Sequence, residues 1–189
     1  MNVSNRKVHK FIGLVVSVQL LLWTISGIFF SFNKIDQIRG ENYLKSVEQV
    51  TPQKISRISF DEAKELVIEK TYLKPISVEE ITEEKRGSEF RGRNLPLYKL
   101  SSLDSSGKEV NVYIDPSLGK IVAIRTFEWR LWDLMWGLHI MDWRDRDDIN
   151  NLFLKIFSIL ALISSVTGII LFFRPCLLYT SDAADERHG

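Results

Sequence analysis

The stretch FIGLVVSVQLLLWTISGIFFSFN, from Phe11 to Asn33, decides the fold class of this 189-residue chain, because it contains no charged residue. A helix needs roughly 20 apolar residues to cross the hydrocarbon core of a bilayer, and this run supplies them. A basic start followed by an apolar run is also typical of a secretory signal peptide. This run is too long for that interpretation, and no small-residue cleavage pattern follows it. We therefore predict an uncleaved transmembrane helix over residues 11–33.

A second apolar run, IFSILALISSVTGIILFF, extends from Ile156 to Phe173 between Lys155 and Arg174. Its length is just sufficient to cross a bilayer. The sequence therefore predicts a second transmembrane helix over residues 152–174, and the lipid bilayer is the first expected partner of the chain.

Basic residues in the first ten positions set the expected orientation. Arg6, Lys7 and Lys10 precede the first apolar run, and no acidic residue lies among them. Because positive charge stays on the cytoplasmic side, we expect residues 1–10 in the cytoplasm. The middle of the chain is then periplasmic or extracellular, and the expected location is a bacterial cytoplasmic (inner) membrane.

Residues 34–128 have the pattern of a small α+β domain. Ser59 is followed three positions later by Glu62, a capping-box signature, and apolar residues then recur at helical spacing. After Pro75 the pattern changes to the alternation that is typical of strands. Four such segments are separated by turn residues: ISVEEITEE, LPLYKLSSL, KEVNVYID and KIVAIR. The expected fold is one or two helices on a small antiparallel sheet, inserted between the two transmembrane helices.

The segment EEKRGSEFRGRN, from Glu83 to Asn94, is rich in charge and glycine. We interpret it as a solvated, mobile hairpin tip in preference to a binding patch, since such connections usually run over the surface.

Composition excludes several classes of function. The net charge is +1 and no Lys/Arg cluster lies along one face, which argues against a nucleic-acid partner. The single cysteine, Cys176, excludes an internal disulfide framework and a cysteine-based zinc site. The sequence has no nucleophile motif, no phosphate-binding glycine loop and no nucleotide fingerprint, so we assign no catalytic residue.

The stretch LWDLMWGLHIMDWRDRDDIN, from Leu131 to Asn150, places His139 in a tryptophan-rich pattern. Because tryptophan prefers the headgroup region, we expect an amphipathic interfacial helix over residues 129–150. Three interpretations of His139 stay open: packing among aromatic rings at the membrane surface, axial ligation of haem iron, or a divalent metal site. The nearby aspartates are more typical of a solvated segment, and we assign no metal ligand among Asp142, Asp145, Asp147 and Asp148.

His9 is the second candidate residue, at the cytoplasmic mouth of the first helix. A membrane-edge position at the headgroup level explains it most simply. With the expected topology, His9 and His139 lie near opposite faces of a bilayer about 30 Å thick, so they cannot ligate the same haem. A six-coordinate haem at either position needs a second ligand from another copy in a homo-oligomer, or from further helices.

Taken together, these stretches resemble the PepSY-associated transmembrane family. SFDEAKELV and VNVYIDPSLGKIVA look like parts of a PepSY domain, whose final hairpin carries tyrosine, Asp-Pro and glycine at this spacing. The run LWDLMWGLHIMDW and the second apolar stretch resemble the segment that follows this domain. The first apolar run resembles the first helix of the family, with these residues in the expected places: Arg6, His9, Gly13, Ser26 and Gly27.

The resemblance implies a link to iron uptake. The family includes membrane proteins that carry haem and reduce ferric siderophores, some with a flavin or iron–sulfur reductase domain downstream. It therefore implies electron transfer through haem b, with His9 and His139 as ligands of separate haems. The alternative is a non-enzymatic membrane-anchored sensor or interaction module that regulates a peptidase or binds another partner.

The last stretch, CLLYTSDAADERHG, resembles the conceptual translation of a sequencing adapter. We therefore expect the natural protein to continue past Pro175, into further helices or a reductase domain. Residues 176–189 are then an artefactual or disordered tail, in which Cys176 and His188 have no function. A genuine short cytoplasmic tail is the alternative.

Overall fold

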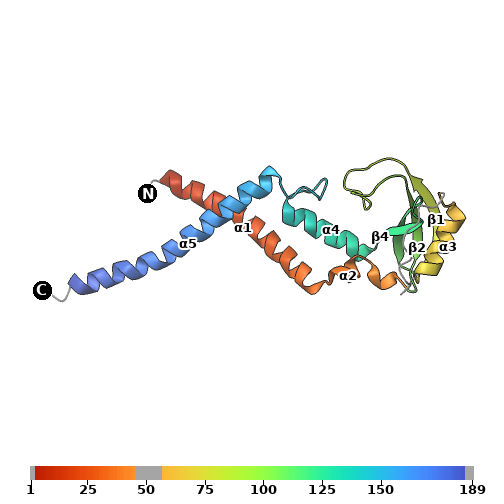
Figure 1. The fold of residues 1–189 in the computed structure, drawn as a ribbon. Helices are drawn as coiled ribbons and strands as arrows, with labels where there is room; N and C mark the ends of the chain where they lie inside the picture. The colour runs from red at the N-terminus through yellow and green to blue at the C-terminus, as the bar shows by residue number, and fades with distance from the viewer. Residues whose placement is uncertain (1–2, 46–56, 186–189) are drawn as a thin grey trace. The chain divides into compact units, whose positions relative to one another are not determined.

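The computed structural model describes the backbone of residues 3–45 and 57–185, and the side chains of residues 11–45 and 57–169. The chain divides into two compact units (Figure 1). One comprises Met1–Ile25 and Asp148–Gly189, and the other comprises Ser26–Asp147. We call the second unit the sheet unit.

The two longest helices are α1 (Val3–Phe32) and α5 (Leu152–Asp185). Within the described residues, two segments are long and apolar enough to cross a membrane: Phe11–Phe32 in α1 and Leu152–Ile169 in α5. They coincide with the two predicted transmembrane helices. Helix α5 extends past its expected end at residue 174 and includes part of the predicted tail, because no glycine or proline follows Pro175 before Asp185.

Four antiparallel strands form the sheet in the order β1-β2-β3-β4, and each falls within a predicted strand segment or within two residues of it. Tyr98 lies opposite Ile114, and Val112 lies opposite Ile124. The strand bounds are β1 (Lys74–Ile81), β2 (Leu97–Leu103), β3 (Glu109–Asp115) and β4 (Lys120–Arg125).

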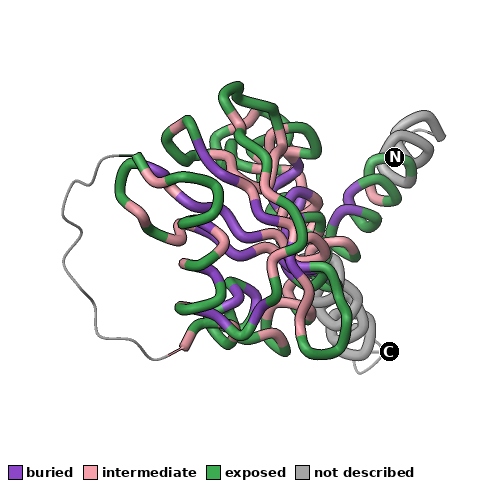
Figure 2. The backbone as a smooth tube through the Cα atoms, turned by 90° about the vertical axis from the view of Figure 1, so that its right-hand side faces the viewer, coloured by how far each residue is buried: buried purple, intermediate pink, exposed green. Residues whose placement is uncertain are grey.

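Helix α3 (Phe60–Lys70) covers one face of the sheet and begins at the predicted capping box. The Glu62 N–H donates to the Ser59 hydroxyl at 3.2 Å, and the Ser59 N–H donates to the Glu62 carboxylate at 2.6 Å. Ala63 and Val67 are fully buried in the core between this helix and the strands. Figure 2 shows buried stretches of chain, in purple, running through the sheet unit. The expected α+β architecture is therefore present in the sheet unit.

The opposite face of the sheet carries a second, smaller core. Because side chains alternate along a strand, Tyr113 points away from α3 and packs with Leu97 and Ala123. Phe90 and Leu95, from the segment before β2, pack against these residues. The segment that we expected to be a solvated tip therefore supplies part of a core.

Two short helices, α2 (Ile35–Ile38) and η1 (Glu41–Tyr43), follow α1. Gly40, between them, has φ +76° and lies so close to β4 that a Cβ would come within 2.7 Å of Ile124 Cγ2. Only glycine allows this backbone conformation and this approach together. The contact fixes the segment after α1 against the edge of the sheet.

Helix α4 (Phe127–Ile140) corresponds to the interfacial helix that we expected over residues 129–150, but it is shorter. It ends because Met141 adopts the left-handed conformation, with φ 58°. The Asp142 carboxylate then accepts the N–H groups of Asp145 and Asp147, at 3.1 Å each, and holds the following residues in a loop. The prediction was wrong beyond Ile140 because an aspartate side chain competes with helical hydrogen bonds.

Candidate functional site

Helix α4 carries His139, and local capping fixes where this helix begins. The hydroxyl of Thr126 accepts the Trp129 N–H at 3.1 Å, which satisfies one backbone donor of the first turn. His139 lies in the last turn, one residue before the end of the helix. The cap and the left-handed Met141 therefore set the position of the histidine along the helix.

His139 contacts the C-terminal part of α1 through a hydrogen bond. Ser26 Oγ lies 2.7 Å from His139 Nδ1, across 113 positions of the chain. Ser26 is 1 % exposed. A hydroxyl can accept an Nδ1–H, and in that tautomer the imidazole lone pair is on Nε2. The contact fixes the plane of the imidazole relative to α1.

Aromatic rings surround His139. The Phe30 ring meets it edge-on at a centroid distance of 5.6 Å, and the Trp136 ring is stacked at 6.4 Å with an interplanar angle of 11°. Trp132 continues the stack on Trp136 at 5.7 Å. We call these four residues the aromatic cluster. The rings that pack around His139 come from both α1 and α4.

Burial lowers the pKa of His139 below its ordinary value, because desolvation disfavours the charged imidazolium. The imidazole is therefore neutral at neutral pH. A neutral imidazole is the form that binds transition-metal ions.

His9 belongs to the backbone of α1, but its side chain lies outside the described side chains. Seventeen positions of α1 separate it from Ser26. At the rise of an α-helix this is about 26 Å along the axis.

A buried carboxylate holds the middle of α4 in place. Asp133, 1 % exposed, accepts hydrogen bonds from Arg91 and, at 2.7 Å, from Arg146 Nη1. Arg91 also donates to the Arg146 carbonyl at 3.3 Å. Three segments therefore meet at one acid: α4, the loop that follows it, and the segment before β2.

Glu89 is half-buried and, like Asp133, acts as a hub, that is, a carboxylate that pairs with side chains from several segments. Its carboxylate accepts from Arg130 Nε at 2.5 Å, from Asn111 Nδ2 at 2.8 Å and from the Tyr113 hydroxyl at 3.0 Å. Burial alone would raise the pKa of Glu89, but the hydrogen bonds from Arg130 and Asn111 outweigh it, and the pKa is lowered. Glu89 is therefore ionised at neutral pH and ties the segment before β2 to both β3 and α4.

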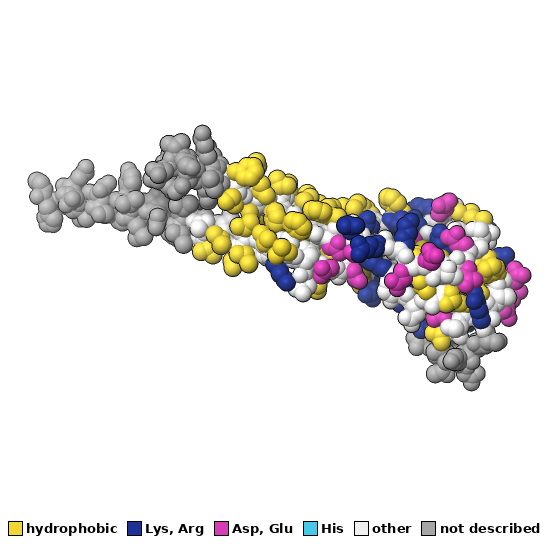
Figure 3. Space-filling view, turned by 90° about the horizontal axis from the view of Figure 1, so that it is seen from above, with side chains coloured by type: hydrophobic (Ala, Val, Ile, Leu, Met, Phe, Trp, Pro, Cys, Tyr) yellow, Lys and Arg dark blue, Asp and Glu magenta, His cyan; other side chains and the backbone are white. Residues whose placement is uncertain are grey.

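These two hubs correct our interpretation of residues 83–94 as a mobile hairpin tip. Glu89 and Arg91, in the middle of that segment, are half-buried and ion-paired with side chains of α4. Other charged residues of the segment, such as Glu84 and Lys85, are exposed to water. In Figure 3, Lys, Arg, Asp and Glu side chains gather together over the sheet unit. Their pairing partners lie 41 and 42 positions away along the chain, so no local pattern could reveal them.

Trp129, the first tryptophan of α4, lies between two guanidinium groups. Arg125 stacks over its ring at 4.2 Å and Arg91 at 5.6 Å from the centroid. Trp129 therefore packs with the sheet unit, whereas Trp132 and Trp136 pack with α1. The tryptophans of α4 therefore divide between two neighbours.

The described residues contain no group of three or more His, Cys, Asp or Glu side chains that could hold a metal ion. The aspartates of the loop after α4 instead accept backbone N–H groups. Their arrangement supports the loop conformation.

The family model described as "PepSY-associated TM region" matches residues 6–176. The chain belongs to this family. As a PepSY-associated transmembrane protein, it is a membrane protein with two candidate membrane-spanning helices and a sheet unit between them. Neither a curated protein nor a solved structure matches the chain.

For this PepSY-associated protein, sequence reasoning found His139 but missed its partner Ser26 and the hubs at Asp133 and Glu89. One local signal was available for Asp133. An acid inside the apolar stretch LWDLMW is costly to bury and therefore indicates a specific partner. The hydrogen bond between His139 and Ser26 joins positions 113 residues apart, so no local sequence pattern indicated it.

Proposed function

We propose that this chain belongs to a haem-binding membrane protein that transfers electrons in iron uptake, and that His139 is one axial ligand. The observation that carries the proposal is the contact between Ser26 Oγ and His139 Nδ1 inside the aromatic cluster. Ligating histidines commonly use one ring nitrogen for the metal and donate the other N–H to a nearby acceptor. In the tautomer with the proton on Nδ1, Ser26 is the acceptor, and Nε2 is then the nitrogen that would bind the metal.

The residues fit one side of a haem. His139 is the only histidine among the described side chains, so a second axial ligand has to come from a second copy of the chain or from another helix. Haem would supply one-electron chemistry when bound. The aromatic cluster partly shields the imidazole from water and provides an apolar surface for a planar macrocycle.

The proposed orientation follows from the basic residues before α1. Arg6, Lys7 and Lys10 favour a cytoplasmic N-terminus, which places the sheet unit and His139 on the opposite side of the inner membrane. His9 would then serve a separate haem near the cytoplasmic face.

The test is the absorption spectrum of the full chain, purified in detergent from cells supplied with a haem precursor. We expect a Soret band and sharp reduced-state bands that His139→Ala removes or shifts, because the axial nitrogen is lost. Ser26→Ala should retain haem but change its reduction potential, because the imidazole loses the acceptor that orients it. His188→Ala serves as the matched control and should leave the spectrum unchanged.

His9→Ala separates the two proposed positions. It should reduce haem content without altering the bands that depend on His139. A folded, colourless wild-type protein, or a His139→Ala variant with the wild-type spectrum, would contradict the proposal.

A second candidate is the interaction module, and the open edge of the sheet favours it. Strand β1 is an outer strand, and Ile76 in it is 61 % exposed. An exposed edge can accept an additional strand from a peptide. For this candidate we expect the purified protein to be colourless and to bind extended peptides, so the spectrum distinguishes the two functions.

A further inference from the structure

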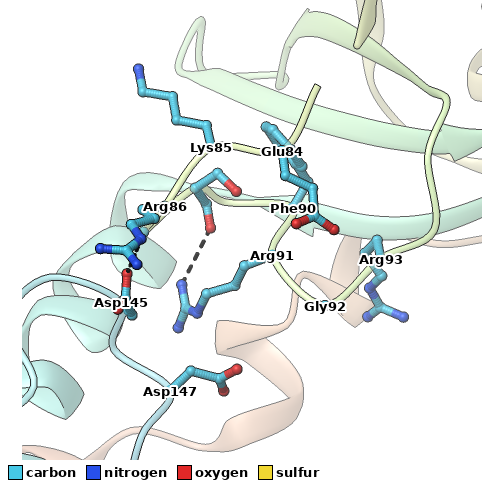
Figure 4. Close-up of a pocket in the computed structure, with 11 residues that line it drawn as sticks. Glu84, Lys85, Arg86, Phe90, Arg91, Gly92, Arg93, Asp145 and Asp147 are labelled. Atoms are coloured by element: carbon cyan, nitrogen blue, oxygen red, sulfur yellow. Dashed lines mark hydrogen bonds and ion pairs between the residues drawn. The ribbon is translucent and has the colours of Figure 1, made fainter. Parts of the chain in front are cut away.

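A pocket of about 320 Å³ lies between the segment before β2 and the loop after α4. Figure 4 shows its lining residues, with Arg86 and Asp145 facing each other across the two segments and Arg91 pointing between them. Its size is at the lower end of the range for small-ligand sites. The pocket is separate from His139 and from the aromatic cluster.

Guanidinium groups outnumber carboxylates beside this pocket. Arg91 and Arg146 share the Asp133 carboxylate, and the Glu89 carboxylate pairs with Arg130. Arg125 donates to the backbone carbonyls of Glu89 and Ile124 and has no carboxylate partner among the described residues. One buried carboxylate, Asp133, and one half-buried carboxylate, Glu89, therefore lie beside a larger group of guanidinium groups, of which Arg93 is exposed: Arg91, Arg93, Arg125, Arg130 and Arg146.

Arg93 is the cation of this group that lines the pocket and has no ion pair among the described side chains. Its charge acts on its neighbour: burial, followed by repulsion from Arg93, lowers the pKa of Arg125 to about 10. An anion beside Arg93 would relieve this repulsion.

The acidic residues of the pocket do not cancel the excess charge. Asp145 faces Arg86 at 3.7 Å, and Glu84 and Asp147 are exposed to solvent, as Arg93 is. Four basic residues line the pocket beside these three acids, namely Lys85, Arg86, Arg91 and Arg93, so the lining keeps a net positive charge.

A polar atom without a partner lies in the same wall. Ser88 Oγ is buried and has no hydrogen-bond partner among the described residues, although almost all buried polar groups in proteins have one. A hydroxyl can donate to an oxyanion. Ser88 and Arg93 together provide a neutral donor and a planar, bidentate cation.

We propose that this pocket binds a phosphate-type anion, with Arg93 as the principal charge and Ser88 as a hydrogen-bond donor. A guanidinium group matches two oxygens of a phosphate, and phosphate oxygens are strong acceptors. The anion is either a free phosphate or the headgroup phosphate of a lipid. The site does not depend on haem.

The first arm of the test uses inorganic phosphate as the probe, with the full chain in neutral detergent. Titration calorimetry and the thermal unfolding midpoint are measured at constant ionic strength, balanced with chloride. We expect phosphate to raise the midpoint and Arg93→Gln to weaken binding at least tenfold. Ser88→Ala should weaken it several-fold, and Arg39→Gln, an exposed arginine outside the pocket, should leave it unchanged.

The second arm uses nanodiscs of phosphatidylcholine with or without phosphatidylglycerol, followed by native mass spectrometry. Retention of phosphatidylglycerol that Arg93→Gln abolishes assigns the site to a lipid headgroup, whereas a response to inorganic phosphate alone assigns it to the free ion. Both outcomes support the site. Because Arg93 has no ion pair to lose, we expect Arg93→Gln to fold normally.

The proposal is overturned if neither probe binds, or if Arg93→Gln and Arg39→Gln affect binding equally. An equal loss in the two variants would indicate general attraction of anions to a basic surface.

Discussion

Arg146 and Asp133 lie thirteen positions apart, and the Arg146 guanidinium donates to the Asp133 carboxylate at 2.7 Å. The pair forms because α4 ends at Ile140 and the loop then folds back over the helix. Gly137 leaves the necessary room, since a Cβ there would lie 3.0 Å from Arg146 Cγ and 3.0 Å from the Asp142 carbonyl oxygen. The loop after α4 is therefore held by a buried charge and by close packing.

Asp133→Asn should destabilise the sheet unit by about 3 kcal/mol, because it leaves two guanidinium groups without their shared carboxylate. Chemical unfolding in detergent, followed by tryptophan fluorescence, measures the change. Asp61→Asn is the control: this side chain is 91 % exposed and pairs only with Lys64, so we expect little change. Equal losses in the two variants would show that Asp133 does not hold α4.

Gly40→Ala and Gly107→Ala separate backbone strain from steric contact. Both glycines have a positive φ, but only a Cβ at Gly40 meets another residue, Ile124. We expect Gly107→Ala to cost about 1 kcal/mol from strain alone. Gly40→Ala should cost about 1–3 kcal/mol more, because it also overpacks the edge of the sheet. Similar unfolding free energies for the two variants would contradict the close approach of Gly40 to β4.

The stability contributed by Glu89 should depend on pH. Its folded-state pKa is lowered, so this stability is fully present above the pKa of an unfolded glutamate, about 4.3, and is lost as the pH falls through the lower folded value. We expect Glu89→Gln to be less stable than wild type by a constant amount from pH 7 to about 5, and the difference to shrink below about pH 4. Unfolding curves across this range provide the measurement. A difference as large at pH 3.5 as at pH 7 would rule out an ionised Glu89.

Ser59→Ala should reduce stability by about 1 kcal/mol, because the Glu62 N–H loses the hydroxyl that accepts it. Ser105→Ala, in the exposed turn between β2 and β3, is the matched control and should have little effect. Thermal unfolding of the two variants under the same conditions tests the capping box. No difference between them would mean that the cap contributes nothing to the fold.

Local signals predicted most of the regular structure. The capping box at Ser59 and the alternation after Pro75 each involve residues within a few positions of one another, and α3 and all four strands formed as expected. The length and lack of charge of the run from Phe11 to Asn33 likewise indicated a membrane helix. The structure has a candidate membrane span at Phe11–Phe32, and the matching family is a transmembrane family.

Contacts between distant positions were not predictable in the same way. Glu89 and Arg91 each carry a charge that looks hydrated in the sequence, and each finds a partner on α4. The end of α4 at Ile140 depends on a left-handed Met141, a residue type that rarely adopts this conformation. The candidate site at His139 could be named from the sequence, but its orientation by Ser26 could not.

The separation of Ser26 and His139 along the chain has a consequence for biogenesis. A ribosome adds about 5–20 residues per second, so the 113 positions between them take on the order of ten seconds to synthesise. During this interval the nascent α1 has already left the ribosome, while its partner on α4 does not yet exist. The aromatic cluster can therefore assemble only after translation has supplied His139, and until then the Ser26 face of α1 lies against whatever surrounds the nascent helix.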